Sequence, residues 1–212
     1  MDPDQQNKIG KTVGYYDKLS DNYDRSYSAY LHHTHDRLLN CMNILPGEKI
    51  LDISCGTGIL AEKLLMRYSD IKLVLNDPSD GMLAIATDRL KAKDAVEFKG
   101  SNAEEINFEE GTFDRVICLN SFHYYADQKK VVRNIHDILK ARGRVNILDW
   151  NRKGWFHLPN TIISLLSPEN INTRSLAEMK CMLEKKHFEI TLEQRWTFRF
   201  WKFYMIEAAK KS

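Results

Sequence analysis

A glycine-rich segment between an apolar run and a helical pattern most constrains how this chain can fold. Residues 49–53 are apolar enough for a buried strand, residues 54–58 read Ser-Cys-Gly-Thr-Gly, and leucines recur at helical spacing across residues 59–68. Gly56 and Gly58 let the backbone turn sharply and approach a ligand closely. The N-terminus of the following helix directs N–H groups towards an anionic group. The segment therefore predicts a strand–turn–helix unit that binds a ligand.

Strand and helix patterns alternate along the chain beyond this unit. Such alternation is typical of an α/β fold, in which helices cover both faces of a mostly parallel sheet. Two apolar runs near the C-terminus are neighbours in sequence, and we expect them to pair as a terminal antiparallel hairpin. The predicted sheet has seven strands, at residues 49–53, 71–76, 96–99, 113–119, 143–148, 188–193 and 201–206, with helices at about 26–44, 59–68, 82–90, 129–139 and 176–186.

The length of 212 residues fits one domain, and we expect a single domain over residues 1–212. Residues 1–30 mix aromatic and acidic side chains and are predicted to form an N-terminal cap, of which the first ten residues are loose. Residues 151–172 are too apolar for a solvated loop, so they are a candidate lid over the site.

The charge and cysteine patterns exclude several classes of partner. The formal net charge is +2 with basic residues spread among acidic ones, so no nucleic acid partner is expected. The four cysteines form no Cys-x-x-Cys pair, which argues against a zinc site or a disulfide framework. The first residues lack the apolar core of a signal peptide, and no run approaches the ~20 apolar residues of a membrane span. We therefore expect a cytoplasmic protein without a transmembrane segment.

A histidine-rich stretch could suggest a metal site. His32, His35 and Asp36 share one helix face at positions i, i+3 and i+4. Since no Cys or second His cluster offers a fourth ligand, we predict no metal site and favour a solvated or pocket-lining helix face.

Polar residues follow the ends of the predicted strands, where ligands bind in α/β sheets. Asp52 is suited to an ammonium group, while the helix N-terminus after it is suited to a carboxylate, so together they could hold an amino-acid zwitterion. Asp77 could accept hydrogen bonds from both ribose hydroxyls. Asn102 and Ala103 offer an amide oxygen and a backbone N–H that could read adenine. The strand ends thus predict a ligand made of an amino acid, a ribose and an adenine.

These segments resemble the class I S-adenosylmethionine-dependent methyltransferases, and particularly the branch that includes the ubiquinone/menaquinone and biotin-pathway methyltransferases. The resemblance runs from about residue 15 to residue 150. Residues 50–58 look like the first motif of the family, 76–83 like its acidic second motif, 100–104 like its adenine-reading motif and 113–124 like its fourth. Residues 15–24 resemble the N-terminal motif of that branch, whose aromatic side chains close over the cofactor.

The resemblance implies a Rossmann-like fold and S-adenosyl-L-methionine as the cofactor. Two residues depart from the family pattern: Ser54 stands where the first glycine is usual, and Asn102 where an aspartate is common. Serine is small enough if its backbone is not left-handed, and asparagine keeps an acceptor for the adenine amino group. The cofactor-binding residues expected from the motifs are Tyr16, Tyr23, Asp52, Ser54, Gly56, Gly58, Asp77, Pro78, Met82, Asn102, Ala103 and Asn120.

His123 follows the fourth strand, where a substrate would meet the methyl group. A histidine titrates near neutrality, so His123 is the best candidate for a catalytic base, although it could instead only pack in the pocket wall. Asp149 and Trp150 end the fifth strand and could face the substrate, or else form a core tryptophan with a solvated aspartate.

We expect this chain to be an enzyme that transfers a methyl group by in-line displacement to a small or lipophilic metabolite, since the candidate lid is apolar and a basic groove is lacking. Two alternatives stay open. A protein of this fold could bind S-adenosylmethionine without catalysis. Residues 56–61 also fit the fingerprint G-x-G-x-x-A, which leaves an NAD-binding oxidoreductase as the less favoured alternative.

Overall fold

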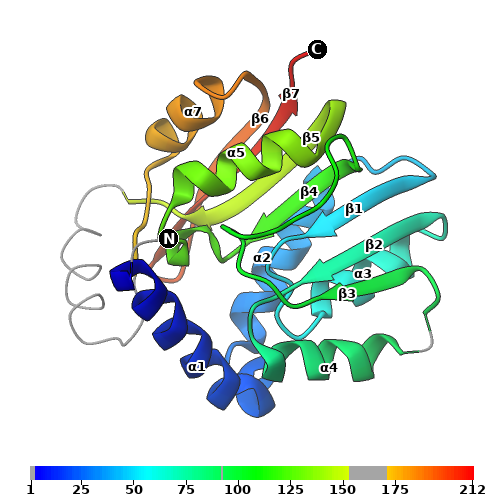
Figure 1. Cartoon of the computed structure of the whole chain (residues 1–212), viewed down its shortest axis with the longest axis vertical. Coiled ribbons are helices and arrows are strands. Elements are labelled where there is room, and N and C mark those ends of the chain that lie inside the picture. The colour runs from blue at the N-terminus through cyan, green and yellow to red at the C-terminus, as the bar shows by residue number, and fades with distance from the viewer. Residues whose placement is uncertain (1–2, 92, 153–170) are drawn as a thin grey trace.

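A seven-stranded sheet forms the centre of the computed structural model, which describes residues 3–91, 93–152 and 171–212 (Figure 1). The strand order is β3-β2-β1-β4-β5-β7-β6. The first five strands pair in parallel, whereas β7 is antiparallel to both β5 and β6. The predicted α/β fold with a terminal antiparallel hairpin is therefore confirmed. The strands are β1 Glu48–Asp52, β2 Ile71–Asn76, β3 Val96–Lys99, β4 Phe113–Leu119, β5 Leu139–Trp150, β6 Phe188–Phe198 and β7 Trp201–Lys210.

Helices lie on both faces of this sheet, as predicted. None of those within the described ranges is long and apolar enough to cross a membrane. The candidate lid, residues 151–172, falls almost entirely on residues 153–170, which lie outside the described residues, so it stays a prediction. The helices are α1 Pro3–Ser26, α2 Ser28–Cys41, α3 Ile59–Arg67, α4 Asp80–Leu90, α5 Gln128–Ile138 and α7 Leu176–Glu184, with a 3-10 turn η1 at Phe122–Tyr124.

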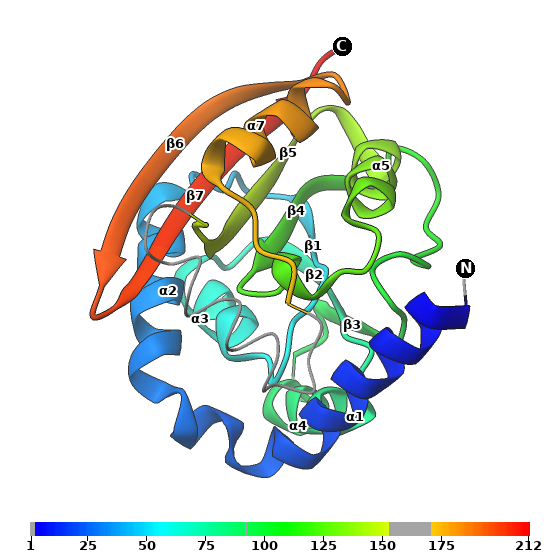
Figure 2. The ribbon, with the colours of Figure 1, turned by 90° about the vertical axis from the view of Figure 1, so that its left-hand side faces the viewer.

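The prediction that the first ten residues are loose is wrong from Pro3 onward, because α1 begins there. Ile9, Val13 and Tyr16 recur at helical spacing and line one cavity. The start of the helix is thus ordered by a tertiary contact that the polar composition of the segment does not reveal. Figure 2 shows α1 running beside α4 along one side of the molecule.

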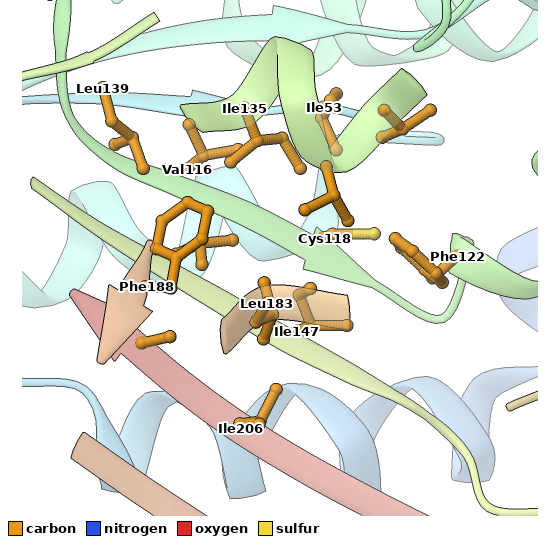
Figure 3. Close-up of a cluster of buried hydrophobic side chains, with 14 of the residues drawn as sticks. Ile53, Val116, Cys118, Phe122, Ile135, Leu139, Ile147, Leu183, Phe188 and Ile206 are labelled. Atoms are coloured by element: carbon orange, nitrogen blue, oxygen red, sulfur yellow. The ribbon is translucent and has the colours of Figure 1, made fainter. Parts of the chain in front are cut away.

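The alternation of side chains along each strand divides the core between the two faces. On β4, Val116 and Cys118 belong to the cluster under α5 and α7, whereas Ile117 and Leu119 belong to the cluster under α2, α3 and α4. Figure 3 shows the first cluster, in which side chains from β4, β5 and β7 meet those of α5 and α7. Strands buried on both sides explain the nearly continuous apolar runs in the sequence.

The order of the strands places the site. The chain builds outward from β1 through β2 to β3 and then returns to β4 on the other side of β1. Ligands in such sheets bind where the order reverses, beyond the carboxyl ends of the strands. Asp52, Asp77 and Asn120 all lie at those ends, next to β1, β2 and β4 respectively.

A buried ion cluster joins four strands near their opposite ends. The guanidinium of Arg115 is 1% exposed, and it donates to Glu48 Oε2 at 2.9 Å, to Glu207 Oε2 at 3.0 Å and to Asn146 Oδ1 at 2.6 Å. It also donates to the carbonyl of Asn43 at 2.8 Å. The charge of Arg115 is therefore fully compensated, and its removal would leave Glu207 buried with less compensation.

The variant Arg115→Met is expected to lower the free energy of unfolding by about 3–5 kcal/mol, because breaking a buried pair leaves an uncompensated charge. Arg144→Met is the matched control, since Arg144 pairs with the same Glu207 but its side chain is 46% exposed. That change is expected to cost about 0–1 kcal/mol. Urea unfolding measures both, and equal losses in the two variants would contradict the assignment.

Candidate functional site

Two adjoining cavities open at the carboxyl ends of the parallel strands. The larger has a volume of about 770 Å³ counting its open mouth, which lies in the range of small-molecule sites. Tyr23, Ser54, Gly56, Leu119 and Asn120 line both cavities. The larger cavity is lined further by Ile9, Thr12, Val13, Tyr16, Asp77, Pro78, Ser79, Met82, Asn102, Ala103, Glu104, Ser121, Tyr124 and Tyr125. The smaller cavity is lined further by Leu31, His35, Asp52, Cys55, Thr57, Ile59 and Leu60.

Most of the predicted cofactor-binding residues meet at these cavities. Asp52 lines the smaller cavity. Gly58 lines neither of the two. The others line the larger cavity, namely Tyr16, Tyr23, Ser54, Gly56, Asp77, Pro78, Met82, Asn102, Ala103 and Asn120.

The glycine turn needs glycine at two positions for different reasons. Gly56 and Gly58 have φ angles of +54° and +79°, in the left-handed region that favours glycine. A Cβ at Gly56 would meet nothing within 4 Å, so its face is open towards the cavities. A Cβ at Gly58 would lie 3.1 Å from the Cβ of Ala86, so Gly58 lets α3 approach α4. The cofactor contact expected of Gly58 stays a prediction.

Ser54 satisfies the condition set by the sequence, because its backbone is not left-handed. Its Oγ lies 2.8 Å from the hydroxyl of Tyr125, which in turn lies 3.1 Å from Ser121 Oγ. The serine that replaces the usual glycine thus joins a hydroxyl network beneath the cavity. Ser121, Tyr124 and Tyr125 were not predicted as site residues, although their place directly after β4 is a signal that could have identified them.

The carboxylate of Asp77 is fixed by two backbone N–H groups. Oδ2 accepts from Gly56 at 2.8 Å and Oδ1 accepts from Ser79 at 3.0 Å. Burial raises the pKa of Asp77 to about 6, against the lowering effect of these two hydrogen bonds. Each carboxylate oxygen can accept a further hydrogen bond, so Asp77 retains acceptor capacity towards the larger cavity.

Asp52 is 2% exposed, and its Oδ1 finds no hydrogen-bond partner among the described residues. Burial raises the pKa of this carboxyl to about 7, and the nearby charge of Asp77 adds to the effect. An unpartnered buried acceptor is costly unless a ligand group or a water satisfies it. The buried carboxylate of Asp52 therefore fits a cationic group bound in the smaller cavity.

The helix α1 is attached to the loops that carry the site. Asp17 Oδ1 accepts from Ser79 Oγ at 2.6 Å, which joins α1 to the start of α4. Asp24 Oδ1 accepts from Thr57 Oγ1 at 2.5 Å, which joins the end of α1 to the glycine turn. The side chains that the N-terminal segment adds to the site are thereby held in place by its own carboxylates.

Two tyrosines of α1 line the larger cavity. The hydroxyl of Tyr16 donates to the hydroxyl of Tyr124 at 2.6 Å, and the rings of Tyr16 and Tyr23 meet edge to face at 6.0 Å between centroids. Asn120 lies nearby with a left-handed backbone, at φ 57°. Its Oδ1 accepts from the hydroxyl of Tyr30 at 2.9 Å, so α2 fixes the side chain that follows β4.

The segment after β3 is held by contacts to α5 and the turn before it. Asn102 donates its amide N–H to Glu105 Oε2 at 3.2 Å, which leaves the amide oxygen as an acceptor. The carbonyl of Ala103 accepts from Asn134 at 3.2 Å. The buried carboxylate of Glu104 accepts from the backbone N–H of Ala126 at 2.8 Å. Asn102 and Ala103 thus line the larger cavity on a well-anchored loop.

His123 is buried beside Tyr124, at the turn that follows β4. Its Nδ1 is 2.5 Å from Asp149 Oδ1, its backbone N–H donates to Asp149 Oδ2 at 2.8 Å, and its ring stacks on Trp150. Asp149 is 1% exposed, so the solvated position left open by the sequence is wrong. His123 Nε2 is buried with no hydrogen-bond partner within the described ranges. His123 lines neither cavity, but its ring contacts Tyr124, which lines the larger one.

The histidine-rich face of α2 is divided between a cavity wall and a salt bridge. His35 is buried and lines the smaller cavity, which is the pocket-lining arrangement that the sequence left open. Asp36 pairs with Lys63 at 2.6 Å instead. Across residues 3–91, 93–152 and 171–212, no group of three or more His, Cys, Asp or Glu side chains is arranged to hold a metal ion.

The chain matches known methyltransferases in sequence. A family model described as "Methyltransferase domain" matches residues 50–143. Ubiquinone/menaquinone biosynthesis C-methyltransferase UbiE of Idiomarina loihiensis is 31% identical over 118 residues, which cover 54% of this chain and 47% of that protein. Malonyl-[acyl-carrier protein] O-methyltransferase 1 of Ilyobacter polytropus is 27% identical over 143 residues, 66% of this chain and 53% of that protein. The chain thus spans about half the length of these curated relatives.

The fold has counterparts among solved structures. A chain of the Haloferax volcanii complex between the Trm112 methyltransferase activator and a methyltransferase aligns with a TM-score of 0.81 at 16% identity, over 93% of this chain and 98% of that chain. The fold and the matched domain are those of the class I S-adenosylmethionine-dependent methyltransferases. The two curated relatives are of the kind that the sequence resembles, namely a ubiquinone/menaquinone biosynthesis C-methyltransferase and a malonyl-[acyl-carrier protein] O-methyltransferase. The predicted resemblance to this family is confirmed.

The buried carboxyl of Asp52 makes a pH-dependent contribution to stability. Because its folded pKa is about 7, above the 3.8 of a free carboxyl, the folded protein binds more protons than the unfolded chain between about pH 4 and 7. The free energy of unfolding should therefore fall as the pH rises through this window. At pH 8, Asp52→Asn is expected to raise it by on the order of 3 kcal/mol in the ligand-free protein, since the cost of the ionised group is removed.

Urea unfolding from pH 4.5 to 8 measures this effect. Asp80→Asn, an exposed change on the same edge of the site, is the control and should leave the wild-type profile unaltered. In the Asp52→Asn variant the free energy of unfolding should still fall with rising pH, but less steeply, because burial also raises the pKa of Asp77. A profile for Asp52→Asn as steep as that of the wild type would contradict the assignment.

Proposed function

We propose that this chain binds S-adenosylmethionine across the two cavities and transfers its methyl group to a small or lipophilic acceptor. The observation that carries the proposal is the placement of two buried carboxylates, Asp52 and Asp77, in adjoining cavities beside one glycine turn. In this arrangement Asp77 faces the ribose and Asn102 with Ala103 faces the adenine. The amino-acid end then extends into the smaller cavity, towards Asp52.

The bound cofactor would supply a sulfonium methyl group that an acceptor attacks in line, with loss of the positive charge on sulfur. The protein would orient the two reactants and exclude water, which accounts for much of the acceleration in such transfers. Tyr16 and Tyr124 close one side of the larger cavity, and Ile9 and Val13 add apolar wall from α1. We propose that residues 1–30 act as the predicted cap in this sense.

His123 is proposed as the base that removes a proton from the acceptor. Asp149 accepts from the Nδ1–H of His123 in the tautomer that leaves a lone pair on Nε2. Asp149 also accepts from the backbone N–H of His123, which helps to fix the ring. Asp149 would then act as a positioning residue that stabilises the protonated imidazole. The stack on Trp150, with centroids 4.0 Å apart, holds the plane of the ring.

The apolar lining of the larger cavity supports a small or lipophilic acceptor. Ile9, Val13 and Leu119 add apolar side chains to that lining, beside the residues assigned to the cofactor. The names of the two relatives specify transfer to carbon in one case and to oxygen in the other. They therefore support the class of reaction and leave the acceptor atom to experiment.

Isothermal titration calorimetry with S-adenosylmethionine and S-adenosylhomocysteine tests the binding proposal. Both should bind, and Asp77→Ala should weaken both by about 100-fold or more, because two charge-assisted hydrogen bonds to the ribose would be lost. The exposed neighbour variant Asp80→Ala should leave both affinities within about twofold of the wild type. Binding of NADH with no binding of either ligand would overturn the proposal in favour of an oxidoreductase.

The role of His123 is tested by the formation of S-adenosylhomocysteine with a panel of lipophilic acceptors. His123→Ala and Asp149→Asn should each lower kcat by about 100-fold or more, the usual contribution of a positioned base. Calorimetric affinity for S-adenosylhomocysteine should persist in both variants.

His136→Ala is the matched control. His136 lies in the last turn of α5, whereas the N-terminus of this helix adjoins the site. Unaltered turnover in His123→Ala would remove His123 from catalysis. Binding of S-adenosylmethionine with no product from any acceptor would favour the noncatalytic alternative.

A further inference from the structure

A second residue that lines the smaller cavity carries an unpartnered buried polar atom, as Asp52 does at Oδ1. His35 is 5% exposed and lines this cavity from α2, one helical turn beyond Leu31, which lines it too. Its Nδ1 is buried without a hydrogen-bond partner among the described residues. Neither the motifs of the family nor the proposed mechanism uses this side chain.

The polar neighbours of His35 on α2 do not account for its position. Lys63 Nζ donates to Asp36 at 2.6 Å and lies 3.4 Å from His32 Nδ1, so these groups pair with one another on the exposed side. Burial lowers the pKa of His35 to about 3, and the charge of Lys63 adds to that effect. His35 is therefore a neutral imidazole, which carries one donor and one acceptor nitrogen.

Two buried, unpartnered acceptors on residues that line one small cavity indicate a ligand group with several N–H donors. An ammonium carries three such donors and a positive charge, which suits both Asp52 Oδ1 and the lone pair of a neutral imidazole. A carboxylate would be repelled by Asp52, and it finds better donors at the N-terminus of α3. The smaller cavity therefore suits the ammonium group of an amino acid, whereas the N-terminus of α3 suits its carboxylate.

We propose that His35 binds the amino-acid end of the cofactor, with Nδ1 accepting a hydrogen bond from the α-ammonium group that also pairs with Asp52. The proposal rests on the proposed function and adds to it a binding residue from α2, outside the matched domain of residues 50–143. His35 would favour nucleosides that carry the amino acid over those that lack it. The N-terminal helices would in this way contribute to cofactor selection as well as to closure.

The test compares two ligands that share the adenosine but differ at this end. Calorimetry with S-adenosylhomocysteine and with 5′-methylthioadenosine, which lacks the amino acid, is done on His35→Leu. The affinity for S-adenosylhomocysteine should fall about tenfold or more, as expected for one lost hydrogen bond to a charged group. The affinity for 5′-methylthioadenosine should stay within about twofold, which shows that the adenosine site is intact.

Two further variants sharpen the result. His35→Asn places an amide near the position of Nδ1 and should recover most of the affinity for S-adenosylhomocysteine. His32→Leu, an exposed change one turn away on the same helix, is the matched control and should leave both affinities unaltered. The deaminated analogue of S-adenosylhomocysteine should bind His35→Leu and the wild type equally, since it has no ammonium to lose.

Three outcomes would overturn the proposal: an unaltered affinity for S-adenosylhomocysteine in His35→Leu, an equal loss for both nucleosides, or a loss for the deaminated analogue as large as for S-adenosylhomocysteine. The last would assign the contact to the carboxylate. Failure of the wild type to bind either nucleoside would instead overturn the proposed function itself, which makes the two failures distinguishable.

Discussion

The carboxylate of Asp77 aligns the parts from which the site is built. It accepts one hydrogen bond from the glycine turn, at Gly56, and one from the start of α4, at Ser79. Ser79 in turn donates its hydroxyl to Asp17 on α1. One buried charge therefore sets the spacing of two strand ends and, through Ser79, the position of the N-terminal helix. Because Asp77 also lines the larger cavity, a ligand group that hydrogen-bonds to this carboxylate would be coupled to the order of these loops.

Asp52 and Asp77 are buried near one another, and Asp52 Oδ1 has no hydrogen-bond partner among the described residues. Burial raises the pKa of both carboxyls, and the charge of Asp77 adds to the effect on Asp52. A cation bound beside Asp52 would favour the ionised form of that carboxyl, so ligand binding should release protons below about pH 7 and raise stability by mass action. The cost of the buried charge in the free protein would in that case favour a cationic ligand.

The parts of the site that were predictable are those encoded locally. Strand ends carry Asp52 and Asp77, and Asn102 follows the next strand closely. The remainder depends on contacts between distant segments. No local pattern reveals that α1 begins at Pro3, that β5 begins directly after α5, or that Asp149 lies under His123, since each depends on packing between elements far apart in sequence. His35 was recognisable only as one member of a helix face.

Two buried histidines illustrate how the surroundings of the same side chain assign different chemistry. Each has one ring nitrogen without a partner in the described parts of the chain, Nδ1 in His35 and Nε2 in His123. Burial lowers the pKa of His35 to about 3, and the charge of Lys63 adds to that effect, so its ring stays neutral and is suited to accepting a hydrogen bond without taking up the proton. His123 has Asp149 at 2.5 Å from its other nitrogen, and a carboxylate in that place stabilises an imidazolium. The first arrangement is suited to binding a ligand whose protonation must not change, and the second to accepting a proton during a reaction. The sequence does not distinguish these two roles. Burial and the charge of Lys63 set the chemistry of His35, whereas the carboxylate of Asp149 sets that of His123.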